Sequence, residues 1–177
     1  MKSQSTSHRI SVRTLTCAAM LTALSIVIGI FCKNFLNFGQ GLFRITFENL
    51  PIILSGLLFG PLVGSLVGAA TDLVSYLLSS QTYPPNLIVT VGAMLVGAVS
   101  GLVARLVRRP GNVRIVLSGA CAHLVGSMIV KTIGLYQFYG ILVLWRIPLY
   151  LVIASLEILV LCHLFRKGVF RKLTETV

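Results

Sequence analysis

Long apolar stretches, separated by short groups of glycine, proline and charged residues, occupy most of the chain. Six stretches can be delimited, at approximately 14–32, 44–59, 64–78, 87–107, 115–135 and 142–165. Apolar windows of about sixteen residues or more that recur almost end to end are typical of helices that cross a bilayer. The pattern therefore predicts an all-α membrane protein with six transmembrane helices, in a single domain over residues 1–177.

Composition and charge agree with a membrane location. The chain has 56% hydrophobic residues and only four acidic side chains, so it cannot supply the polar surface that a soluble domain of 177 residues needs. The net charge of +11 would also suit a protein that binds nucleic acid. However, the basic residues collect in short gaps between the apolar stretches, which favours a role in membrane topology.

The distribution of lysine and arginine predicts that both termini are cytoplasmic. With the N-terminus inside, eleven of the fifteen basic residues fall in cytoplasmic segments, as the positive-inside rule requires. These residues are Lys2, Arg9, Arg13, Arg105, Arg108, Arg109, Arg114, Arg166, Lys167, Arg171 and Lys172. The first apolar stretch lacks a clear small-residue cleavage site, which favours a retained helix over a signal peptide.

The other four basic residues, Lys33, Arg44, Lys131 and Arg146, fall at the predicted outer ends of four different helices. The positive-inside rule works against this position. Either their side chains snorkel to the outer headgroups, or they line an outward-facing pocket for an anion. Four such cations on four helices favour the pocket.

Aromatic residues are concentrated at the same predicted level, with few at the inner side. The outer group consists of Phe35, Phe38, Phe43, Phe47, Tyr76, Tyr83, Tyr136, Phe138, Tyr139, Trp145 and Tyr150. An interfacial aromatic belt is the alternative, but a belt should be two-sided. The excess of aromatic residues at the outer level favours side chains that form the walls of a site and stack on a flat ligand. Phe43, Tyr83 and Trp145, near the cations, are the candidates.

Small and polar residues inside the stretches indicate how the helices pack. Small residues recur every four positions, at Gly56, Gly60, Gly64 and Gly68, at Gly97 and Gly101, and at Ala122 and Gly126. This spacing lets helix backbones approach closely in lipid. Asp72, His123 and Glu157 lie deeper, where hydrogen bonding between helices is the favoured role and a proton relay the alternative.

The sequence lacks the common short motifs of nucleotide binding and of catalysis. It contains no phosphate-binding G-x-x-x-x-G-K-[ST], no G-x-S-x-G and no H-E-x-x-H. Cys17, Cys32, Cys121 and Cys162 lie in or at the ends of apolar stretches, without metal-ligand spacing, and read as small hydrophobes. The sequence therefore predicts neither an enzyme nor a cofactor or metal site.

Three segments carry a family resemblance: RITFENLPIILSGLLFGPLVGSLVGAATDLVSYLL, the following YPPN, and WRIPLYLVIASLEILVL. Over nearly the whole chain, from Ala19 to Leu164, the sequence resembles the S components of energy-coupling factor vitamin transporters, and most of all the folate-type members. The resemblance implies a six-helix protein of the bacterial plasma membrane that captures a vitamin from outside. It also implies two kinds of partner, a transmembrane T subunit and two cytoplasmic ATPases.

The resemblance also assigns roles to individual residues. Ala19 and Ala23 match an A-x-x-x-A motif through which the family contacts the T subunit, and Arg146 with Pro148 matches an Arg-x-Pro pattern of the folate-type sequences. Folate offers flat rings for stacking and two carboxylates for the cations. The alternatives are an S component for another vitamin or precursor, such as pantothenate or a pyrimidine, and a stand-alone proton-coupled carrier.

Overall fold

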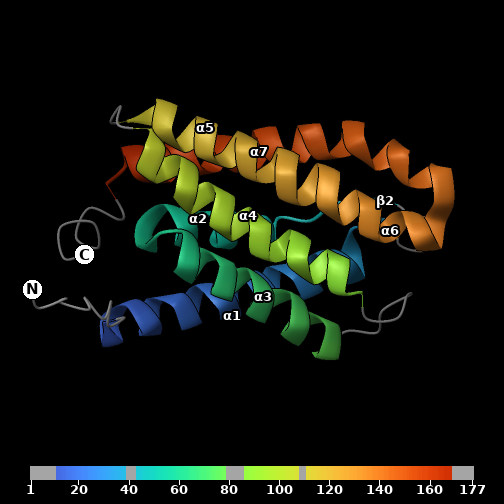
Figure 1. Ribbon diagram of the computed structural model, residues 1–177, viewed down its shortest axis with the longest axis horizontal. Coiled ribbons are helices and arrows are strands. Elements are labelled where there is room, and N and C mark those ends of the chain that lie inside the picture. Colours follow the sequence, from blue (N-terminus) through green and yellow to red (C-terminus); the bar gives the residue numbers. More distant parts are fainter. Residues whose placement is uncertain (1–10, 39–42, 79–85, 108–110, 169–177) are drawn as a thin grey trace, which may run out of the picture.

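The computed structural model describes residues 11–38, 43–78, 86–107 and 111–168, and helices account for nearly all of this part of the chain (Figure 1). The elements in chain order are α1 (Val12–Phe35), β1 (Asn37–Phe38), β2 (Phe43–Arg44), α2 (Asn49–Phe59), α3 (Pro61–Leu78), α4 (Leu87–Leu106), α5 (Asn112–Ala122), the π-helix η1 (His123–Val130), α6 (Lys131–Tyr139), the 3₁₀ helix η2 (Gly140–Trp145) and α7 (Arg146–Arg166). Strands β1 and β2 form a minimal antiparallel pair. The predicted all-α class is confirmed.

Among the described residues, four helical runs are long and apolar enough to cross a membrane. They are Val12–Phe35, Pro61–Leu78, Leu87–Leu106 and Asn112–Arg166. The last run reverses direction at Gly140, whose φ of 57° lies in the left-handed region that favours glycine. Helix α7 therefore returns beside α5 (Figure 1). The described chain begins and ends at the same end of the bundle (Figure 1).

Helix α2 differs from the sequence prediction. A helix was expected over approximately 44–59, but it begins only at Asn49, because Arg44 lies in β2 and the Ile45 amide donates to the Leu36 carbonyl. Eleven residues give a helix about 16 Å long, which is too short to cross a hydrocarbon layer of about 30 Å by itself.

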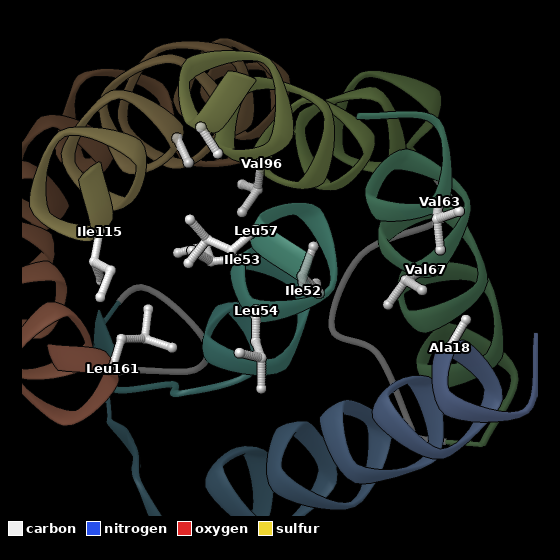
Figure 2. Packing of buried hydrophobic residues seen from close by; sticks show 12 residues of the cluster. Ala18, Ile52, Ile53, Leu54, Leu57, Val63, Val67, Val96, Ile115 and Leu161 are labelled. Atoms are coloured by element: carbon white, nitrogen blue, oxygen red, sulfur yellow. The ribbon is translucent and has the colours of Figure 1, made fainter. Parts of the chain in front are cut away.

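Helix α2 instead lies at the centre of the bundle. Figure 2 shows its side chains Ile52, Ile53, Leu54 and Leu57 surrounded by α1, α3, α4, α5 and α7. The surrounding helices contribute Ala18, Val63, Val67, Val96, Ile115 and Leu161 to this core. All residues from 51 to 57 are buried. The segment that reads as a membrane span in the sequence is thus a core helix that touches five others.

Glycines make the close approach between α2, α3 and α4 possible. A Cβ atom added at Gly64 would lie 2.5 Å from the carbonyl oxygen of Gly97, and one added at Gly56 would lie equally close to that oxygen. Gly60, with a φ of 93°, makes the turn between α2 and α3. The predicted packing role of the small residues is confirmed at these positions.

Replacement of Gly97 by alanine is expected to lower the thermal midpoint of the purified protein in detergent. The new methyl group would collide with the backbone of Gly64, which cannot move without separating α3 from α4. Overpacking of this kind costs about 1–3 kcal/mol. Leu102→Ala on the same helix alters a side chain that is exposed on the bundle surface and should leave the midpoint nearly unchanged. An unchanged midpoint for Gly97→Ala would show that the contact is not required.

Candidate functional site

A small cavity lies beside the last turns of α1 and α3 and the first turns of α4 and α7. These turns lie at the end of the bundle opposite to the one where the described chain begins and ends (Figure 1). The described lining residues of the cavity are Lys33, Glu48, Asp72, Ser75, Tyr76, Asn86, Val89, Lys131, Leu135, Arg146 and Tyr150. They come from α1, the start of α2, α3, α4, α6 and α7. Three cations and two carboxylates thus meet in a chain that has few charged residues in its apolar helices.

Lys131 is the most buried of the three cations, with 4% of its surface exposed. Its Nζ donates to Asn49 Oδ1 at 3.2 Å and lies 3.6 Å from Glu48 Oε1. Asn49 in turn donates from Nδ2 to Ser127 Oγ, and the Ser25 hydroxyl donates to the Glu48 carbonyl oxygen. A buried ammonium needs such partners, because desolvation of an isolated charge is costly. The cluster ties α1, α2 and α6 together.

Arg146, at the first turn of α7, has 7% of its surface exposed. Its Nη2 donates to Tyr150 Oη at 2.9 Å, and its Cζ lies 4.9 Å from the centre of the Tyr150 ring. The buried Nε has no hydrogen-bond partner among the described residues. Within the same part of the chain, no carboxylate lies at ion-pair distance from the guanidinium. Arg146 therefore offers a charged donor to an anion in the cavity.

Polar contacts between helices fix the rest of the lining. Lys33 Nζ donates to the Ser75 carbonyl oxygen at 3.4 Å, which joins α1 to α3. The Thr90 hydroxyl donates to Asp72 Oδ2 at 2.7 Å, which joins α4 to α3. Asn86 caps α4 by accepting the Ile88 amide. Its Nδ2 also donates to the Gly134 carbonyl oxygen at 2.6 Å.

The structure brings together three of the predicted site residues, Lys33, Lys131 and Arg146. Trp145 is 66% exposed and is not part of the described lining. Phe43 and Arg44 lie in β2, but their side chains, and all of Tyr83, lie outside the described residues. A role in substrate binding remains a prediction for each of these seven residues.

Sequence reasoning left several lining residues without a place in the site, notably Glu48, Asp72 and Asn86. The sequence signal that could have identified Glu48 and Asp72 is the scarcity of acidic residues in the chain. The chain has four acidic residues, and two of them lie at this cavity. Carboxylates retained at apolar helices mark functional or pairing positions.

The deeper polar residues link helices, as the sequence predicted. His123 Nε2 lies 2.7 Å from Glu157 Oε2, and both side chains are almost completely buried between η1 and α7. Asp72 is bonded to Thr90 instead and does not join this pair. The three residues are therefore divided between two contacts rather than aligned in one relay.

Ala19 and Ala23 lie exposed on α1. Ala19 lines an apolar groove of about 190 Å³ between α1 and α3, together with Ala18, Leu66 and Val67. The groove shares no lining residue with the polar cavity and differs from it chemically. It is a surface on which another apolar helix could pack.

The sequence matches the family described as "ECF transporter, substrate-specific component" over residues 13–173. The chain belongs to this family. The comparison with curated proteins gave no match. Among solved structures, this S component is similar to the one titled "Crystal structure of FolT bound with folic acid", with 20% sequence identity and a TM-score of 0.67. The likeness covers 88% of this chain and 93% of that chain and shows a shared fold. The family and the apolar helices make this an integral membrane protein.

Proposed function

We propose that this S component binds folate from outside the cell, at the cavity lined by Lys33, Lys131 and Arg146. The observation that carries the proposal is the meeting of three largely buried cations at one end of an apolar bundle. A buried cation is costly unless it serves pairing or ligand binding. The FolT structure, which shares the fold and holds folic acid, supports folate as the ligand.

The chemistry of the cavity suits both ends of folate. The two carboxylates of its glutamate tail are acceptors for Arg146 and the lysines. Tyr76 and Tyr150 offer aromatic faces to its flat rings, and Glu48 and Asp72 offer acceptors to the amino and ring N–H groups of the pterin. The cavity measures about 40 Å³, enough for a few water molecules, whereas ligand pockets typically span about 300–1,000 Å³. Binding therefore requires the lining side chains to separate.

Import requires partners that the chain does not include. The sequence has no nucleotide-binding motif, so we assign ATP hydrolysis to two cytoplasmic ATPases and coupling to a transmembrane T subunit. In this arrangement the chain crosses the bacterial plasma membrane six times, with α2 and the segment before it forming one short crossing. Both termini are cytoplasmic, and the folate cavity opens outward.

A thermal-shift screen of the purified protein against a vitamin panel tests the choice of ligand. Folate should raise the midpoint more than pantothenate or a pyrimidine precursor does. A larger shift from one of those compounds would reassign the substrate within the family. Uptake that proceeds without ATPase partners and collapses with a protonophore would instead indicate a proton-coupled carrier.

Leucine at both Ala19 and Ala23 is expected to block co-purification with the T subunit. The two side chains lie one turn apart on α1, and Ala19 borders the apolar groove, so added bulk would hold a partner helix away. Folate binding by the isolated S component should persist, because the cavity lies elsewhere. Ala120→Leu, on the exposed surface of α5, is the matched control and should still co-purify. Loss of folate binding with intact co-purification would show that the faces are wrongly assigned.

A further inference from the structure

A second, larger pocket lies at the end of the bundle where the described chain begins and ends. Its volume is about 470 Å³, and it is lined by the end of α2, the beginning of α5 and the end of α7. One side is apolar, with Leu57, Leu58, Ile115 and Phe165, and the other carries Arg114 and Arg166. The pocket shares no residue with the folate cavity.

The arginines of this pocket have no acidic partner among the described residues. The chain has only four acids. Glu48 and Asp72 line the cavity at the other end, Glu157 contacts His123 in the bundle interior, and Glu175 lies outside the described residues. The buried Nε atom of Arg114 also has no hydrogen-bond partner in the described part of the chain. The two guanidinium groups can therefore donate hydrogen bonds to an anion from outside the described chain.

The position of the pocket indicates where that anion comes from. Arg114 lies in the first turn of α5 and Arg166 at the end of α7, and these helix ends lie side by side (Figure 1). Helix ends in a membrane protein lie near the lipid headgroups. The neighbouring side chains Val113, Val116 and Leu117 are exposed on α5, which makes this face of the helix apolar and suited to acyl chains. Asn112 and Gly111 also border the pocket, and Gly111 supplies no side-chain cap to the first amides of α5.

We propose that this pocket binds an anionic phospholipid, with the phosphate on Arg114 and Arg166 and the glycerol and upper acyl chains against Phe165 and Ile115. Basic pockets between transmembrane helices are suited to acidic headgroups. Guanidinium groups form paired hydrogen bonds with phosphate oxygens, and the apolar wall accepts the chain. The inference requires only that the protein is integral to the membrane and does not depend on folate.

Native mass spectrometry of the purified chain, titrated with phosphatidylglycerol or phosphatidylcholine of identical acyl chains, tests the proposal. Two arginines should favour the anionic lipid by roughly tenfold to thirtyfold. The double substitution Arg114→Gln, Arg166→Gln should reduce this preference to less than about threefold, whereas Arg114→Lys, Arg166→Lys should retain most of it. Lys167→Gln, which removes an exposed charge next to Arg166, is the matched control and should retain the full preference.

Three results would overturn the proposal. They are equal binding of the two lipids, an unchanged preference in the double glutamine variant, and an equal loss in Lys167→Gln, which would indicate diffuse surface charge. Displacement of the lipid by millimolar inorganic phosphate would assign the site to a soluble anion. Circular dichroism verifies that each variant is folded. If the double variant does not fold, Arg166→Gln alone, at an exposed helix end, should still lower the preference measurably.

Discussion

Replacement of Lys131 by methionine is expected to weaken folate binding at least about a hundredfold and to lower the thermal midpoint of the ligand-free protein. The change removes the ammonium partner that lies 3.6 Å from Glu48 and 3.2 Å from Asn49. Removal of one member of a buried ion pair costs about 3–5 kcal/mol. A loss of about 1.4 kcal/mol corresponds to a factor of ten in affinity. Calorimetric titration and a thermal melt measure the two effects separately.

A second substitution separates the direct role of Lys131 from its role in pairing. In the double variant Glu48→Gln, Lys131→Met, no charge remains in the pair, so the thermal midpoint should recover in part. Folate affinity should stay below that of Glu48→Gln alone if Lys131 itself contacts the ligand, since Glu48 is also a proposed acceptor for the pterin. Recovery of both would mean that Lys131 only neutralises Glu48. Lys167→Met, at an exposed lysine in the opposite end of the bundle, should change neither quantity.

Replacement of Arg146 by alanine is expected to weaken folate binding by about one to two orders of magnitude. Hydrogen bonds to charged groups contribute about 1.5–3 kcal/mol. The guanidinium is buried, already oriented by Tyr150, and retains an unpartnered Nε among the described residues. Arg146→Lys should recover only part of the loss, because an ammonium cannot form two parallel hydrogen bonds with one carboxylate.

Pteroic acid, which lacks the glutamate tail, is the control ligand for Arg146. If Arg146 holds a tail carboxylate, Arg146→Ala should barely change the affinity for pteroic acid. Equal losses for both ligands would place Arg146 at the ring end or give it a structural role. No loss of affinity for either ligand would mean that Arg146 does not bind folate and that its side chain is at the outer end of the helix because it snorkels to the headgroups. Tyr150→Phe removes the hydroxyl that holds Nη2 and should produce a smaller loss with the same ligand dependence.

The helices and the cationic cavity could be predicted from sequence for simple physical reasons. A long apolar stretch has few stable structures other than a membrane-spanning helix. Because a charge within such a stretch is costly, Lys33, Lys131 and Arg146 could be recognised as candidate site residues. Their meeting at one cavity follows from helices that alternate in direction, which places the ends of α1 and α3 beside the beginnings of α4 and α7 (Figure 1). The glycine spacing predicted close packing because only glycine allows such contact.

Other features depend on tertiary contacts that no local pattern contains. An apolar helix can face lipid or protein, so hydropathy could not show that α2 is enclosed by five helices. Glu48 pairs with a lysine far along the chain, and nothing near either residue predicts the pair. Trp145 was expected beside Arg146 because it precedes it in sequence. On a helix, however, the neighbour on the same face is one turn away, and Tyr150 occupies that position.

Calorimetric titration of the purified wild-type protein with folic acid tests the central claim most directly. The account predicts one folic acid bound per chain, with a dissociation constant below about 1 µM, equivalent to about −8.2 kcal/mol or more. It also predicts that pteroic acid binds more weakly, since the cations gain nothing from a ligand without the tail. Folic acid that gives no binding, while pantothenate or a pyrimidine precursor saturates the protein, would contradict the account.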